Sequence, residues 1–206
     1  MRLPGLLTLS GMNMPRDTLS DGSDDALLLL FARGDGDAAR VLTGRLLPRV
    51  YHQARRMLGD QSEAEDVAQE AMMRLWRIAP DWQQGGAKVT TWLYRVTANL
   101  CTDRLRRRRG SALDDIDEPS DPAPGMEQRL QRRARADALQ QALDDLPDRQ
   151  RQAVVLRHLE GLGNPEIAEI MEISTEAVES LTARGKRALA AALAGRKEEL
   201  GMTEDD

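Results

Sequence analysis

Four polar side chains that can bind nucleic acid recur every three or four residues between positions 95 and 106. They are Arg95, Asn99, Thr102 and Arg106. This spacing puts them on one face of a helix predicted over 90–109. Apolar stripes flank that face (Leu93, Val96, Leu100; Tyr94, Cys101, Leu105). Because arginine, asparagine and threonine contact phosphates and base edges, this set, the polar strip, is a candidate nucleic-acid surface.

An arginine cluster ends the same predicted helix, since every position in 104–109 except Leu105 is arginine. Such a run is most often only a solvated helix end. Arginine, however, binds phosphate through two parallel hydrogen bonds, so we favour nucleic-acid binding. Trp82 lies in the preceding polar loop, 79–88. Its ring can pack into the core, or it can stack on an unpaired base.

A second candidate DNA surface lies in 164–193, where two helical patterns are separated by about three residues. Asn164 and Pro165 predict the start of the first helix, and Ser174 is the expected N-cap of the second. The expected inner positions are Ile167, Ala168, Ile170 and Met171, then Ala177, Val178, Leu181 and Ala188. A helix-turn-helix places its second helix in the DNA major groove, and Arg184, Lys186 and Arg187 suit phosphate. A plain helical hairpin inside a bundle is the alternative.

A third surface is expected on the helix predicted to open at Ser62, with Glu65 completing a capping box. Its buried face is Val67, Ala71, Leu75 and Ile78, and the opposite face carries Asp66, Gln69, Glu70 and Met73. A methionine exposed among carboxylates is typical of a protein-binding patch, although a solvated face is the simpler interpretation. We call these four residues the acidic patch.

Composition limits the classes of protein that fit. The 206 residues are 41% hydrophobic but only 3% aromatic, which favours an all-α fold. The net charge of −5 excludes a uniformly basic DNA-coating protein, so nucleic-acid binding must be local. A single cysteine, Cys101, excludes an intrachain disulfide, and His52 and His158 lie near no cysteine. We therefore expect no metal or other cofactor, no membrane insertion, a buried Cys101 and a cytoplasmic protein.

The predicted organisation is two small helical modules. Residues 1–22 are expected to be a disordered extension, in which Met12 or Met14 can be the true start. Module 1 covers 23–109, a flexible acidic linker covers 110–125, module 2 covers 126–195, and 196–206 is a polar tail. Within module 2 the helix after Pro147 is expected to turn Ala153, Val154, Leu156 and Leu159 inward.

Four stretches in this order resemble bacterial sigma factors of the extracytoplasmic-function (ECF) group. They are AEDVAQEAMMRLWR at 64–77, TTWLYRVTANLCTDRLRRRR at 90–109, LDDLPDRQRQAVVLRHLEGL at 143–162, and the helix-turn-helix. The resemblance implies that module 1 is sigma region 2, which binds core RNA polymerase and the promoter −10 element. It also implies that module 2 is sigma region 4, which binds the −35 element, and that an anti-sigma protein controls the chain.

The resemblance also implies roles for single residues. The acidic patch would bind the β′ clamp of polymerase. Melted −10 DNA would contact Trp82, Trp92, Arg95, Asn99, Thr102 and Arg106, with Asn99 at a flipped-out base. Double-stranded −35 DNA would contact Ser174, Thr175, Glu176, Glu179, Ser180, Arg184, Lys186 and Arg187. Glu176 and Glu179 depart from the basic residues common in the family, but carboxylates can accept from cytosine N4.

Two other classes of protein remain as alternatives. A stand-alone helix-turn-helix regulator would bind DNA without polymerase, and its acidic patch would be accidental. A helical nucleotide hydrolase would hold magnesium with carboxylates such as Glu63, Glu65, Asp66 and Glu70. The hydrolase is disfavoured because no facing helix in module 1 offers a matching acidic pair. No catalytic residue is therefore assigned.

Overall fold

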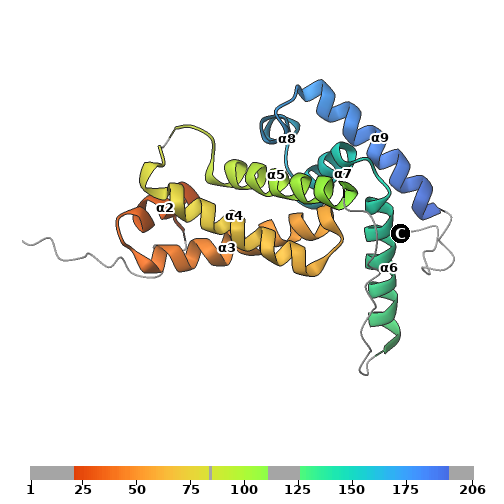
Figure 1. Cartoon of the computed structure of the whole chain (residues 1–206), viewed down its shortest axis with the longest axis horizontal. Coiled ribbons are helices and arrows are strands. Elements are labelled where there is room, and N and C mark those ends of the chain that lie inside the picture. The colour runs from red at the N-terminus through yellow and green to blue at the C-terminus, as the bar shows by residue number, and fades with distance from the viewer. Residues whose placement is uncertain (1–20, 84, 111–125, 195–206) are drawn as a thin grey trace, which may run out of the picture.

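The chain forms two helical modules that pack side by side, in a computed structural model that describes residues 21–83, 85–110 and 126–194 (Figure 1). Every element in these ranges is helical, as the all-α prediction requires. Module 1 contains α2 (Asp24–Ala32), α3 (Gly36–Leu58), α4 (Gln61–Ile78), the short η1 (Ala79–Asp81) and α5 (Val89–Gly110). Module 2 contains α6 (Met126–Asp144), α7 (Asp148–Val154), the π-helical η2 (Val155–Leu159), α8 (Asn164–Met171) and α9 (Thr175–Ala194).

Three predicted segments fall outside the described ranges. They are most of the N-terminal extension (1–22), nearly all of the acidic linker (110–125) and the polar tail (196–206). Within the described part of the chain, no helix combines the length and the apolar character needed to cross a bilayer.

The core of module 1 is built around α3, which α4 and α5 cover. Leu42, Leu46, Val50 and Ala54 recur every four residues along α3 and are fully buried. This spacing places them on one stripe of the helix, as the sequence predicts. The helix runs through Pro48 and ends at Gly59, whose φ of 71° is the left-handed conformation of a C-cap glycine.

The N-terminal caps correct two predictions. Helix α4 begins at Gln61 rather than Ser62, because the Asp60 carboxylate accepts a hydrogen bond from the Glu63 N–H at 2.7 Å. Helix α8 already includes Asn164, and Gly163 precedes it as the N-cap. In contrast, Ser174 does cap α9, since its Oγ accepts from the Ala177 N–H at 3.2 Å.

The π-helical segment η2 explains why one predicted core residue is on the surface. Ala153, Val154 and Leu156 are buried as expected, but the Leu159 side chain is 41% exposed. A π-helix has more residues per turn than an α-helix, so the inner face shifts after Val155 and Leu159 turns outward.

Helix α9 turns Gly185, rather than the predicted Ala188, towards the core. Val178 and Gly185 are buried, whereas Ala188 is exposed. A Cβ atom at position 185 would lie 2.5 Å from Val154 Cγ2 and 3.3 Å from the Gln150 carbonyl oxygen. The absence of a side chain therefore allows α9 to approach the backbone of α7 closely.

The two modules share buried surface. Leu143 and Leu146, near the end of α6, belong to the same apolar cluster as the core of module 1, while Tyr94 of α5 belongs to the core of module 2. The buried Arg151 of α7 donates hydrogen bonds to the carbonyl oxygens of Met57 in α3 (2.6 Å) and Asp144 in α6 (2.6 Å). The modules thus meet through both apolar packing and a buried guanidinium.

Replacing Gly185 with alanine should destabilise the protein, although alanine normally favours a helix. The added methyl group has no room against Val154 and the Gln150 backbone, and overpacking of this kind costs about 1–3 kcal/mol. Gly44 is the matched control: it lies within α3, and a Cβ atom there meets nothing within 4 Å. Gly44→Ala should raise the free energy of unfolding by about 0.5–1 kcal/mol. Urea denaturation measures both, and equal stabilisation by the two variants would contradict the packing argument.

Cys101 should be unreactive in the native protein. It is fully buried in α5, and this burial raises the pKa of its thiol to about 12. Only the thiolate attacks a disulfide reagent, so the native chain should react negligibly at pH 8. After denaturation in guanidinium one thiol per chain should react at once. Rapid reaction of the native chain with the same aromatic disulfide would show that the side chain is accessible.

Candidate promoter and polymerase interfaces

The polar strip lies on the exposed edge of α5, as the spacing predicts. Asn99, Thr102 and Arg106 are exposed, and Arg95 is about one-third exposed. Thr102 donates to the Ala98 carbonyl oxygen at 2.9 Å, and Arg106 pairs with Asp103 at 2.8 Å. The structure therefore brings the four residues together on one surface, where Asn99 presents its amide to solvent.

Trp82 and Trp92 form a wall at the start of α5. Their rings meet edge to face with centroids 6.3 Å apart. Trp82 Nε1 also donates to the Asp25 carboxylate at 3.1 Å, which ties the loop to the start of α2. Both tryptophans are partly buried. Trp82 thus packs against the core of module 1 without being fully buried.

Part of the arginine cluster has internal partners that the sequence alone did not reveal. Arg108 donates to the Leu58 carbonyl oxygen at 2.8 Å and to Glu63 at 3.0 Å, which fixes the end of α5 against α3 and α4. Arg109 pairs with Asp148 of module 2. A run of charge says nothing about which cations have partners far away in the sequence. Arg108 and Arg109 therefore stabilise the fold through contacts within the chain.

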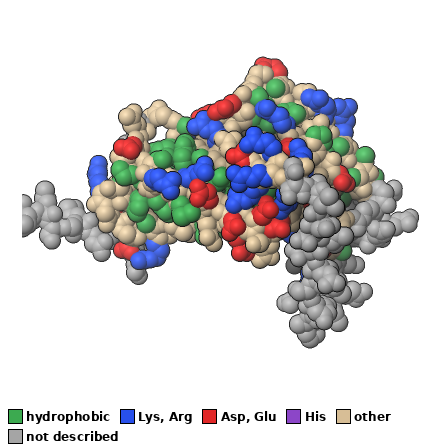
Figure 2. Space-filling model, in the orientation of Figure 1, with side chains coloured by type: hydrophobic (Ala, Val, Ile, Leu, Met, Phe, Trp, Pro, Cys, Tyr) green, Lys and Arg blue, Asp and Glu red, His purple; other side chains and the backbone are tan. Residues whose placement is uncertain are grey.

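The acidic patch lines a groove of about 400 Å³ between α4 and α5. Met73 is 51% exposed, and Glu70 pairs with Arg74 at 2.8 Å. The hydrogen bond from Arg74 is the main cause of the lowered pKa of Glu70. Figure 2 shows Lys and Arg side chains gathered over α4 and α5, with Asp and Glu side chains among them. The groove therefore presents mixed charge around an exposed methionine.

Sequence reasoning missed the α5 side of this groove. Asp103, Arg104 and Arg107 line it opposite the acidic patch. The signal was available, because these positions follow Leu100 at three, four and seven residues and so share its face of the helix. The arginine cluster therefore divides its side chains between different faces of α5.

The residues predicted to contact −35 DNA lie along α9 or, for Ser174, at its N-cap. Glu176, Glu179, Ser180, Arg184, Lys186 and Arg187 are exposed, as is Ser174, while Thr175 is partly buried. Arg184, Lys186 and Arg187 sit in the middle of a helix that continues to Ala194. Their positions are thus not explained by attraction to the negative end of the helix dipole, which acts within the last turn.

The two unexpected carboxylates of α9 have local partners. Hydrogen bonds from its own backbone N–H and from the Ser174 and Thr175 hydroxyls lower the pKa of Glu176. Glu179 accepts from Asn164 Nδ2 at 3.2 Å, which links α9 to the start of α8. Asn164 therefore orients Glu179 instead of capping α8. In the described ranges no three His, Cys, Asp or Glu side chains gather as a metal site requires.

Two family models match this chain in the order of its modules. The model described as Sigma-70 region 2 matches residues 42–111, and the model described as Sigma-70, region 4 matches residues 136–189. The first match covers α4, α5 and most of α3, and the second covers α7, α8 and most of α9. Neither match is expected of a nucleotide hydrolase. A region 2 match is also not expected of a stand-alone helix-turn-helix regulator.

Curated relatives and a solved structure agree with these matches. ECF RNA polymerase sigma factor SigW of Bacillus subtilis is 31% identical over 76% of this chain and 89% of its own length. SigE of Mycolicibacterium smegmatis is 36% identical over 75% of this chain, which spans 61% of that longer protein. The structure of CnrH in complex with the cytosolic domain of CnrY is 26% identical, covers 84% of this chain and 99% of CnrH, and has a TM-score of 0.63. The chain belongs to the ECF RNA polymerase sigma factors.

Proposed function

We propose that this chain binds core RNA polymerase, directs it to promoters through their −10 and −35 elements, and stabilises the melted −10 DNA. The observation that carries the proposal is the exposed polar strip on α5. The acidic-patch groove adjoins it, since Arg106 pairs with Asp103, and the same chain contains a helix-turn-helix. A regulator acting without polymerase would need only the helix-turn-helix. As a polymerase subunit the chain would act in the cytoplasm, and its proposed role requires no covalent chemistry of its own.

The groove between α4 and α5 is the proposed binding site for the β′ clamp. Met73 offers exposed apolar surface, and Asp66, Gln69 and Glu70 surround it with acceptors. An apolar centre with a polar rim is the usual arrangement of a protein interface. Asp103, Arg104 and Arg107 supply charge of both signs on the facing wall, which suits a partner segment that itself carries mixed charge.

Melting of the −10 element would be driven by the polar strip. Extruding a base from the duplex costs a few kcal/mol in lost stacking and pairing. Asn99 is exposed and can hydrogen bond the edge of an extruded base, while Trp82 and Trp92 offer a wall beside it. Arg95 and Arg106 would hold the backbone of the single strand. These contacts offset the cost only when polymerase holds module 1 in register on the promoter.

Recognition of the −35 element is assigned to α9. Arg184, Lys186 and Arg187 would contact phosphates, together with Ser174, Thr175 and Ser180. Glu176 and Glu179, the latter oriented by Asn164, would offer carboxylate oxygens that accept a hydrogen bond from cytosine N4. We also propose that an anti-sigma protein binds this chain, because the similar protein CnrH was solved in complex with a second protein, CnrY.

Reversing the charge of Glu70 should weaken binding to core polymerase. Glu70→Lys places a fourth cation beside Arg74, Arg77 and Arg104, whose positive charges act on Glu70 in the native protein. We expect the apparent affinity for core to fall about 10- to 100-fold. Glu65→Lys is the matched control, since Glu65 is exposed on the same helix outside the groove. Equal affinities of the two variants in a fluorescence binding assay would count against the groove as the clamp site.

Removing the Asn99 amide should impair melting and leave core binding intact. In run-off transcription from a library of promoter fragments, Asn99→Ala should lower transcripts about 10- to 100-fold, the effect of losing one or two hydrogen bonds to a base. Mismatched templates with an open −10 element should reduce this deficit. Gln61→Ala, which removes an exposed amide from α4, is the control. If the wild-type protein binds DNA without core polymerase and gives no new transcripts with it, the stand-alone regulator is favoured over the sigma factor.

A further inference from the structure

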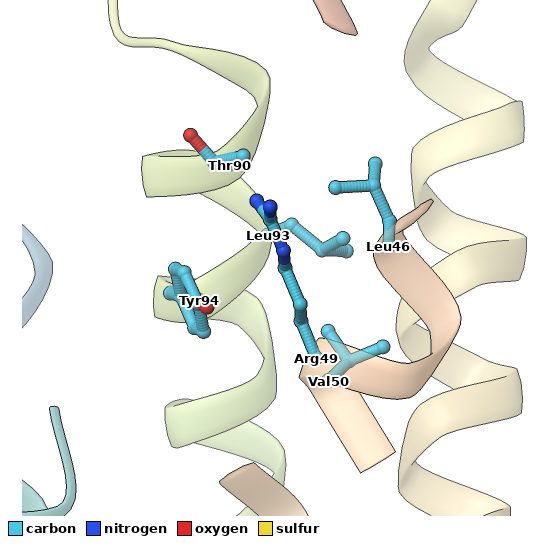
Figure 3. Close-up of a pocket in the computed structure, with 6 residues that line it drawn as sticks. All are labelled: Leu46, Arg49, Val50, Thr90, Leu93 and Tyr94. Carbon is cyan, nitrogen blue, oxygen red and sulfur yellow. The ribbon is translucent and has the colours of Figure 1, made fainter. Parts of the chain in front are cut away.

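Two places where side chains could recognise a base differ in access. The hollow between α3 and α5, lined among others by Arg49 and Tyr94 (Figure 3), has a volume of about 10 Å³, which is no more than one water molecule needs. A base cannot enter it. Helix α9, in contrast, runs along the outer edge of the molecule (Figure 1), where most of its polar side chains are exposed. Readout of bases by α9 thus requires no cavity.

Helix α8 holds the Glu179 carboxylate of α9 in place. Glu179 Oε1 accepts a hydrogen bond from Asn164 Nδ2 at 3.2 Å, and the Glu179 side chain is exposed. The two helices pack through an apolar cluster that contains Ile167, Ile170 and Val178. The position of the carboxylate is therefore defined relative to the whole helix-turn-helix.

Asn164 is available for this contact because other groups cap α8. The Gly163 N–H donates to Glu166 Oε2 at 3.2 Å, and the Ile167 N–H donates to the Gly163 carbonyl oxygen at 3.0 Å. The Asn164 amide is thus not needed at the end of its own helix. Because an amide carries no charge, it orients Glu179 without neutralising it.

The two carboxylates near the start of α9 differ in how many acceptor sites remain. An ionised carboxylate has about four lone-pair sites. Glu176 accepts from its own backbone N–H and from the hydroxyls of Ser174 and Thr175, and these three donors lower its pKa. Among the described residues, Asn164 provides the hydrogen bond that Glu179 accepts. Glu179 therefore keeps more of its capacity for a donor outside the chain.

A carboxylate held over the major groove discriminates between bases through charge. Cytosine presents the N4 amino donor, and adenine presents the N6 amino donor beside the N7 acceptor. Guanine presents two acceptors, and thymine presents one acceptor and a methyl group. A carboxylate is thus attracted by cytosine and repelled by guanine and thymine, and adenine lies between these cases.

The cations of α9 are spaced to offset the repulsion between Glu179 and the DNA backbone. Arg184, Lys186 and Arg187 follow Glu179 by five, seven and eight residues, which corresponds to about 7–12 Å along the helix axis. The major groove is about 12 Å wide, so these cations can reach bordering phosphates while Glu179 lies over base edges. The same helix can therefore bring a carboxylate to the bases and cations to the backbone.

We propose that Glu179, oriented by Asn164, makes cytosine the preferred base at one position of the −35 element. The assignment to the −35 element rests on the proposed function, whereas the preference for cytosine rests on the Asn164–Glu179 pair. Glu176, which its local donors hold at the start of α9, does not contribute to this position.

Selection from randomised DNA tests this preference. The full-length chain would select from promoter fragments randomised over the −35 region together with core polymerase, and from short random duplexes alone; the bound DNA would be sequenced. The wild type should favour cytosine over guanine and thymine about 5- to 100-fold at one position. Glu179→Gln should move that position to adenine, because glutamine pairs with adenine N6 and N7. Glu176→Gln, the same change about one turn earlier, should leave it at cytosine.

Asn164→Ala tests the positioning role of the amide. Loss of one hydrogen bond should lower the cytosine preference at that position about fivefold and leave the other positions unchanged. Asn164→Gln, which keeps an amide donor, should restore part of it. These ratios compare DNA bound by the same molecules, so they do not depend on how much of a variant is folded. An unchanged preference in Asn164→Ala would overturn the role of Asn164.

The two selections distinguish failure of the cytosine preference from failure of the proposed function. The preference is overturned if cytosine persists in Glu179→Gln, if Glu176→Gln moves it instead, or if Glu179→Gln weakens all positions equally. Selection by the chain alone that follows Glu179, with no enrichment and no transcripts in the presence of core, would overturn the proposed function alone. No enrichment in either selection would overturn both.

Discussion

The burial of α5 on two flanks determines what this protein can present to other molecules. Leu93, Leu100 and Cys101 pack into the core of module 1, while Tyr94, one residue from Leu93, enters the core of module 2. A helix held on both sides can expose only the edges that these contacts leave free. Asn99, Thr102 and Arg106 lie on one such edge, and Asp103, Arg104 and Arg107 line the groove beside it. The orientation of the polar strip is thus a consequence of packing, because burial of the apolar residues beside it fixes the rotation of α5 about its axis.

Close approach between helices is the second constraint on the fold. Gly185 lets α9 lie against α7, because a Cβ atom there would overlap Val154. Gly59 ends α3 in the left-handed conformation, and a Cβ atom there would lie 2.8 Å from Asp144 Oδ2 of α6. The first glycine allows the second helix of the helix-turn-helix to pack against α7, and the second glycine lies where the modules meet. Both positions lack a side chain where another helix comes near.

The chain is acidic overall, but it carries a group of cations on α5 and on the loop before it. The net charge is −5, yet the contacts between the modules set cations of α5 and its preceding loop against carboxylates of module 2. The paired carboxylates lower the local positive potential around these cations.

The sequence by itself determined the all-α class, the order of the helices, the polar strip, the acidic patch and the Ser174 cap. These features depend on helical periodicity and on hydrogen bonds between near neighbours, so local residues suffice to predict them. Only the tertiary structure decided that Arg108 and Arg109 have internal partners, that Asp103, Arg104 and Arg107 share the groove with Glu70, and that Arg95 meets Glu172. It also moved Leu159 to the surface through a π-helical segment and buried Gly185 in place of Ala188. Each of these features depends on how closely a second helix packs. The residue pattern within one helix cannot predict the separation between two helices.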